Sequence, residues 1–258
     1  MTIGRQGLQA ALLPAAGFVG LVLLLAWAYL VRMEWGMLHM DVGSDMWIMP
    51  RMVGWKAVDI ALVFVMWAVM MAAMMLPSAL PVILLVAKVS ASMQSRPAVG
   101  LTGAFITGYL LTWCGFSLAA TLLQWGLLEA ALITPMMQSA SVALSAAVLI
   151  AAGIYQFTPL KNVCLRQCQS PLGIVMEVVA GPRRALITGL WHGLYCVGCC
   201  WALMGLLFVT GVMNLLWVLI LAGYVGLEKL LPGTRWLSRT TGVLLCGAGV
   251  WLAITPIA

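Results

Sequence analysis

The sequence predicts an all-α protein made of membrane-spanning helices. Of its 258 residues, 64% are hydrophobic and only 8% are charged, and the mean hydropathy is +1.09. The apolar residues form long unbroken runs, as transmembrane helices require, and do not alternate with polar residues as in a membrane β-barrel. We therefore expect a polytopic helical bundle that forms a single integral membrane domain over residues 1–258.

Seven apolar runs are long enough to be expected as membrane spans. They lie at residues 12–31, 57–87, 101–125, 139–157, 185–209, 212–228 and 240–257. The first follows Arg5 and is expected to be an uncleaved anchor helix. The second is longer than a straight span requires and contains Pro77 and Pro81, which predict a kink or break there.

The distribution of Lys and Arg predicts a cytoplasmic N-terminus and an extracytoplasmic C-terminus. In this orientation ten basic residues, Lys161 and Lys229 among them, fall in cytoplasmic segments and three fall outside, as the positive-inside rule expects. Residues 32–56 then form an extracytoplasmic loop and residues 158–184 a cytoplasmic loop. The net charge of +6 does not indicate nucleic-acid binding, because most of the Lys and Arg residues lie in short loops, where they set the orientation of the chain.

The expected span at residues 185–209 carries an unusual set of polar and sulfur-containing side chains. They are His192, Cys196, Cys199, Cys200 and Met204. On an α-helix this spacing places all of them on one face. Thiolate and thioether groups favour monovalent copper over magnesium or calcium, and polar groups inside a bilayer usually serve a function. The pattern therefore predicts a metal site, most simply for Cu(I).

Two other interpretations of this face stay open. Buried Cys also packs as a small hydrophobe, and zinc is possible because His192, Cys196 and a further Cys supply three of the four ligands of a closed zinc site. Gly189 and Gly193 on the same span predict that a neighbouring helix approaches closely.

The second span contains two stripes of methionine. Met66, Met70 and Met74 repeat at four-residue spacing, as do Met71 and Met75, so two adjacent stripes run towards the prolines. Thioethers in such a row are typical of a relay of weak metal sites. The competing interpretation is packing, since Met commonly fills gaps between helices.

The outer segment is rich in further soft ligands. Residues 33–52 contain six Met, one His and three carboxylates, and Met37, His39 and Met40 are the donors we single out as metal ligands. Thioethers do not ionise and bind copper on an oxidising face, which favours a capture site. An interfacial segment with Met and Trp in the headgroup region is the alternative.

The expected cytoplasmic segment contains Cys164 and Cys168, which lie one turn apart if the segment is helical. Lys161 and Arg166 nearby favour the thiolate forms. Two thiolates hold a metal or oxidise to a disulfide, and a reducing cytoplasm favours the metal. Two unrelated free cysteines remain the competing interpretation.

Three sequence blocks and a short tail occur together in a fixed order. They read MMAAMMLP at residues 70–77, YQFTPLKNVCLRQC at 155–168, GLYCVGCCWALM at 193–204 and GVMN at 211–214. Over about residues 55–230 the chain resembles a family of bacterial predicted metal-binding integral membrane proteins, a domain of unknown function. The resemblance implies a multi-helix inner-membrane protein that handles a metal, copper foremost. By motif it implies Met74, Met75, Cys164, Cys168, Cys196, Cys199 and Cys200 as site residues.

These patterns predict a bacterial inner-membrane protein that binds, delivers or transfers Cu(I). It would serve as a chaperone, assembly factor or transporter for a membrane cuproenzyme, with the bilayer as its other partner. Neither a phosphate-binding glycine loop nor a catalytic triad is visible, so an enzymatic activity is not expected. Two alternatives stay open: a thiol–disulfide oxidoreductase that uses Cys196 and Cys199, and an accessory subunit of a larger membrane complex.

Overall fold

The computed structural model describes residues 5–38, 55–92, 98–132, 141–170, 172–212, 214–231, 233 and 235–255. These residues form ten α-helices and contain no β-strand, which confirms the predicted all-α class. The helices are α1 (Arg5–Leu38), α2 (Ala57–Ser92), α3 (Ala98–Glu129), α4 (Val142–Gln156), α5 (Pro159–Gln169), α6 (Leu172–Val178), α7 (Pro182–Gly205), α8 (Leu207–Thr210), α9 (Leu215–Leu230) and α10 (Arg235–Ile254).

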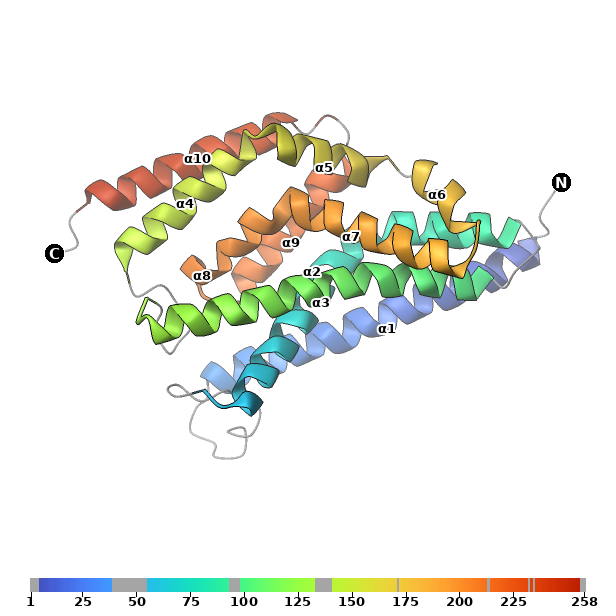
Figure 1. Ribbon diagram of the computed structural model, residues 1–258, viewed down its shortest axis with the longest axis horizontal. Helices are drawn as coiled ribbons and strands as arrows, with labels where there is room; N and C mark the ends of the chain where they lie inside the picture. Colours follow the sequence, from blue (N-terminus) through green and yellow to red (C-terminus); the bar gives the residue numbers. More distant parts are fainter. Residues whose placement is uncertain are drawn as a thin grey trace.

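The helices form a bundle whose middle lies around α7. The most extensive helix–helix contacts join α3 to α7, α4 to α10, α2 to α3 and α1 to α2, while α5 lies against α7 and α9 contacts α2. Figure 1 shows α1 and the α4–α10 pair at opposite edges, with α7 between them. Side chains that α7 directs towards α2, α3 and α9 are therefore at the centre of the fold.

Five helices are long and apolar enough to cross a membrane, and the α4–α5 pair makes a sixth crossing if it is one span bent by 63°. α9 corresponds to the predicted span at 212–228 but has 16 residues, shorter than the roughly 20 of a typical crossing. The structure is thus compatible with a multi-pass membrane protein, and five or six of its helical segments have the length and composition of a crossing, compared with the seven predicted.

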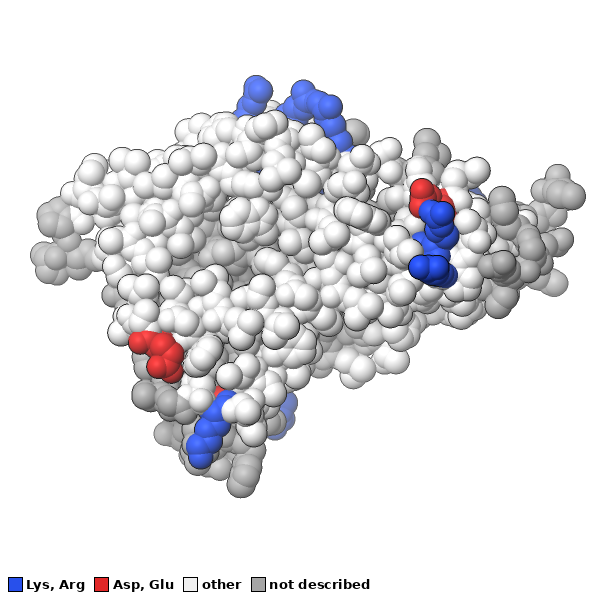
Figure 2. All heavy atoms as spheres, viewed as in Figure 1, with Lys and Arg blue, Asp and Glu red and all other residues white. Residues whose placement is uncertain are grey.

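The surface agrees with lipid contact. Figure 2 shows Lys, Arg, Asp and Glu gathered in separate patches on this face, with a broad uncharged surface between them. Large apolar side chains such as Leu24, Leu111 and Leu244 are exposed. A soluble protein rarely leaves so much continuous apolar surface uncovered.

Both prolines of α2 are accommodated inside one continuous helix of 36 residues. Each proline removes a backbone donor and crowds the preceding turn, which bends a helix. Figure 1 shows α2 changing direction between its two ends. The disruption predicted at Pro77 and Pro81 is therefore a bend and not a break.

Small residues bring α3 and α7 together. A Cβ on Gly189 would collide with the backbone of Phe105, and a Cβ on Gly193 would collide with the Thr112 side chain. The Thr112 hydroxyl also donates a hydrogen bond of 3.1 Å to the Leu190 carbonyl. The close approach predicted at the two glycines is confirmed, and it sets α3 directly against the cysteine-bearing part of α7.

The turn after α4 folds α5 back onto α7. Thr158 caps α5 by accepting a hydrogen bond from a backbone N–H of the first turn, and Pro159 begins the helix. A Cβ on Gly198 of α7 would lie 2.7 Å from the Cys164 sulfur, so the missing side chain makes room for α5. The Tyr155 hydroxyl donates to the Gly198 carbonyl and fixes the same contact.

Candidate metal centre

The predicted donors of α7 all face the interior of the bundle. His192, Cys196, Cys199, Cys200 and Met204 are between 0% and 5% exposed. Helical spacing aligns them on one face, and the packing turns that face away from the surface of the bundle. All seven cysteines of the chain are free thiols.

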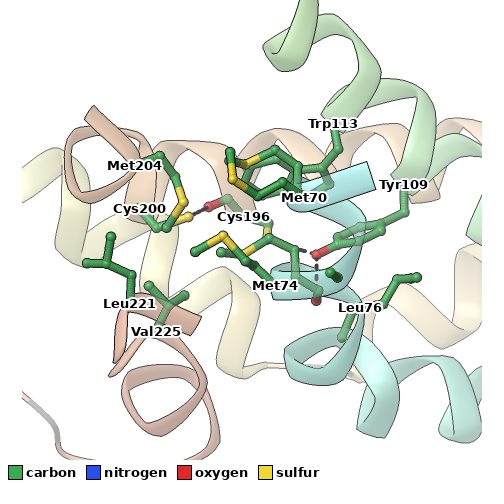
Figure 3. Close-up of a cluster of buried hydrophobic side chains, with 14 of the residues drawn as sticks. Met70, Met74, Leu76, Tyr109, Trp113, Cys196, Cys200, Met204, Leu221 and Val225 are labelled. Atoms are coloured by element: carbon green, nitrogen blue, oxygen red, sulfur yellow. Dashed lines mark hydrogen bonds between the residues drawn. The ribbon is translucent and has the colours of Figure 1, made fainter. Parts of the chain in front are cut away.

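Methionines of α2 lie on the facing side of this centre. All five members of the two predicted stripes are at most 1% exposed: Met66, Met70, Met71, Met74 and Met75. Figure 3 shows Met70 and Met74 in one cluster with the labelled Cys196, Cys200 and Met204, and the sulfur atoms of the two helices lie near one another. Both the relay and the packing interpretation of the stripes agree with this burial.

Lys229 of α9 enters the centre, which the sequence did not predict. It is one of the ten basic residues that predict the orientation, and the structure shows that its side chain is buried. Its ammonium group lies 2.8 Å from the Cys196 sulfur, 3.2 Å from the Ser78 hydroxyl and 3.7 Å from the Met75 sulfur. A cation thus contacts both a thiol and a thioether that were predicted as metal ligands.

Tyr109 of α3 closes the other side of Cys196. Its hydroxyl lies 3.1 Å from the Cys196 sulfur and donates a hydrogen bond of 3.2 Å to the Met75 carbonyl. Figure 3 shows the ring reaching from α3 towards Cys196. Because its hydrogen is directed to the Met75 carbonyl, the hydroxyl oxygen can accept from the Cys196 thiol and fix its orientation, as partners of metal ligands commonly do.

The second predicted thiol pair also belongs to the centre. Cys164 and Cys168 lie on α5, within the segment expected to be a cytoplasmic loop, and both are buried. The thiols of Cys168 and Cys199 are close enough to influence each other electrostatically. The thiols of Cys199 and Cys200 each donate to the Cys196 carbonyl at 3.0 Å. The thiols of α5 and α7 therefore form one cluster.

His192 stands one turn before Cys196 on α7. Its ring packs against the rings of Phe105 and Tyr109, each with a centroid separation of 5.8 Å. Its Nδ1 atom is buried and has no hydrogen-bond partner among the described residues. Because buried polar atoms nearly always have a partner, this unpaired nitrogen is available as a metal ligand beside the sulfur cluster.

The donor chemistry of the centre fits a soft monovalent ion, although the ligands do not yet surround one. Within the described ranges, no three side chains of the His, Cys, Asp and Glu types are already arranged to hold a metal. Residues on one helix face point outward side by side and cannot enclose an ion alone. Closure therefore needs donors from α2 or α5, which lie against this face.

The predicted capture site cannot be placed in the same way. His39 and Met40 lie outside the described residues, and Met37 is part of α1 without a described side chain. The outer Met/His segment therefore remains a prediction.

A second buried charge cluster lies beside the centre. Lys161 of α5 and Glu228 of α9 form an ion pair of 2.6 Å, and both side chains are 1% exposed. The carboxylate also accepts from Ser238 and, at 3.1 Å, from Tyr224, while Lys161 donates to the Gln156 side chain. The residues of this cluster come from α4, α5, α9 and α10, so their hydrogen bonds hold these four helices together.

Sequence reasoning missed Lys229 and Tyr109 as parts of the centre. The available signal was the adjacent Glu228 and Lys229 at the end of an apolar run, because two ionisable groups there must each find a buried partner or reach water. Tyr109 gives no comparable signal, since its role depends on a contact with a residue 87 positions away.

The family comparison agrees with the soft-ligand chemistry. A family model described as a copper chaperone, PpoB2, matches residues 64–252, and the chain therefore belongs to this copper-chaperone family. The match covers the sulfur donors of α2, α5 and α7 discussed above, and it confirms the predicted association with copper. The description of the matched family names copper. The family that the sequence resembles is described only as metal-binding. No curated protein and no solved structure matches the chain.

Proposed function

We propose that this copper chaperone carries Cu(I) in the sulfur-lined centre between α2, α5 and α7 and delivers it to a copper-using membrane protein. The observation that carries the proposal is the convergence of buried thiols and thioethers from three helices that are distant in sequence. Copper is here the cargo, so the centre must both bind the ion and release it.

In this proposal the thiols of α7 are the principal ligands. Two of the three thiols Cys196, Cys199 and Cys200 supply thiolates, and Met74 and Met75 approach from α2. Met70 and Met204 extend the thioether lining, and His192 Nδ1 offers a nitrogen donor. Thiolate and thioether ligands select the monovalent state of copper. Zinc is less well served, because structural zinc sites close with four Cys, His or carboxylate ligands and thioethers are not among them.

The same arrangement supports a route for the cargo. Copper is collected by the extracytoplasmic segment 32–56 and passes along the methionine stripes of α2 to the centre. Cys168 and then Cys164 take it from the centre and release it on the cytoplasmic side, where segment 158–184 lies. The proximity of Cys168 to Cys199 supports the last step. The proposal keeps the N-terminus in the cytoplasm of a bacterium and places the chain in the inner membrane as a single domain.

Metal content of anaerobically purified protein tests this function. Wild type should contain copper after loading with Cu(I), and the variant C196S/C199S/C200S should lose it. The matched control is C114S/C246S, because these two thiols are only half-buried and lie outside the sulfur cluster. Copper retained by the triple variant would contradict the proposed centre.

Thiol trapping of the same samples addresses the redox alternative. Thiols that become protected when Cu(I) is added support metal carriage. A reversible disulfide between Cys196 and Cys199, together with protein that takes up no copper, would instead support a thiol–disulfide oxidoreductase.

A further inference from the structure

Among the buried charges that the structure describes, one cation has no carboxylate partner. Lys161 is neutralised by Glu228 at 2.6 Å. Lys229 follows Glu228 directly in α9, yet its side chain turns towards Cys196. In the part of the chain that the structure describes, Lys229 forms no ion pair with Asp or Glu. Burying an unbalanced charge is costly, so the sulfur centre must supply the compensating negative charge.

The position of Lys229 is fixed by the groups around its ammonium. Cys196, Met75 and Ser78 contact the Nζ atom from α7 and α2. Two of these three are sulfur ligands of the proposed site, so any ion bound there lies within a few ångströms of the ammonium. The charge of Lys229 therefore becomes part of the electrostatics of the bound metal.

We propose that Lys229 makes this centre selective for a monovalent over a divalent metal ion, an inference that rests on the proposed function. Two thiolates around a monovalent ion carry one net negative charge, which the ammonium neutralises. Two thiolates around a divalent ion are already neutral, and the ammonium then remains unbalanced in a buried site. Lys229 thus acts as a specificity-determining residue that need not bind the metal.

The expected size of the effect follows from Coulomb's law. A divalent ion places one additional positive charge near the ammonium. In a protein interior of intermediate dielectric constant, this repulsion at a separation of several ångströms disfavours binding by on the order of 100-fold. A cation on the surface would have a much smaller influence because solvent screens it.

Relative affinity for two ions tests the inference in the full-length protein. Cu(I) and Zn(II) affinities are measured by chelator competition under anaerobic conditions, with Ag(I) and Co(II) as a second pair. In K229M the ratio of Cu(I) to Zn(II) affinity should fall by on the order of 100-fold, whereas K229R should keep the wild-type ratio. K88M removes an exposed cation of α2 and should leave the ratio unchanged.

A second variant tests the same charge without removing the lysine. S78D places a carboxylate beside the ammonium, which lies 3.2 Å from the Ser78 hydroxyl, and should also shift the ratio towards Zn(II). S78N is the uncharged control of similar shape. Ratios unchanged in both K229M and S78D would overturn the selectivity role. If the triple cysteine variant also kept its copper, the proposed function itself would be wrong, and the two failures are thus distinguishable.

Discussion

Lys161 and Lys229 are both buried in one bundle, yet Lys161 contacts a carboxylate while Lys229 contacts a thiol. The Lys161 cluster reinforces its ion pair with hydrogen bonds, since Glu228 also accepts from Tyr224 and Ser238. The Lys229 cluster consists of groups that also bind metals. A carboxylate keeps its lysine permanently neutralised, whereas a thiol can exchange its proton for a soft metal ion. We infer that the first cluster serves stability and the second serves the cargo.

Breaking the Lys161–Glu228 pair should produce the largest loss of stability. Replacing one partner of a buried ion pair leaves the other charge uncompensated, which typically costs about 3–5 kcal/mol. We therefore expect K161M or E228Q to lower the thermal midpoint in detergent strongly, and K229M to lower it much less. When Lys229 is removed, Cys196 can take up a proton, and the resulting neutral thiol tolerates burial as a small hydrophobe.

The double variant K161M/E228M is the informative control for this prediction. Because it removes both charges, its stability should lie above that of either single variant. Equal or greater damage in the double variant would show that the cluster contributes packing and hydrogen bonds rather than charge. Copper stoichiometry of the folded fraction should stay unchanged in all three proteins.

Tyr109 and Tyr224 allow the same comparison with a smaller change. Each hydroxyl contacts one cluster: Tyr109 the Cys196 sulfur at 3.1 Å and Tyr224 the Glu228 carboxylate at 3.1 Å. Loss of a group that orients a metal ligand usually lowers affinity by about 10–100-fold. We expect Y109F to weaken Cu(I) binding within this range and Y224F to affect thermal stability alone. Equal Cu(I) affinities in both variants would remove Tyr109 from the centre.

Features that depend on one segment were well predicted from sequence. The all-α class follows from long apolar runs, because a helix satisfies its backbone groups without a partner segment. The shared face of the α7 donors follows from helical periodicity. The methionine stripes of α2 were predicted for the same reason, and all five side chains are buried.

Features that depend on contacts between distant segments were not predicted. The positive-inside rule uses Lys229 only to orient the chain and says nothing about which groups its side chain contacts. The burial of Lys229 depends on Cys196, 33 residues earlier in the chain. Likewise α5 was expected in a loop, because its packing onto α7 depends on the space left at Gly198.

The smallest expected effect concerns α5, which carries residues of both clusters. A Cβ at Gly198 would lie 2.7 Å from the Cys164 sulfur, so G198A should rotate this side chain while Lys161 stays anchored to Glu228. Stability should change by less than about 1 kcal/mol, because alanine is also the better helix former. Cu(I) affinity at Cys196 should be retained, but release of bound copper to a competing chelator should slow if Cys164 lies on the exit route. G205A, on the same helix with nothing within 4 Å of its Cβ, should release copper at the wild-type rate, and identical rates in the two variants would exclude Cys164 from the route.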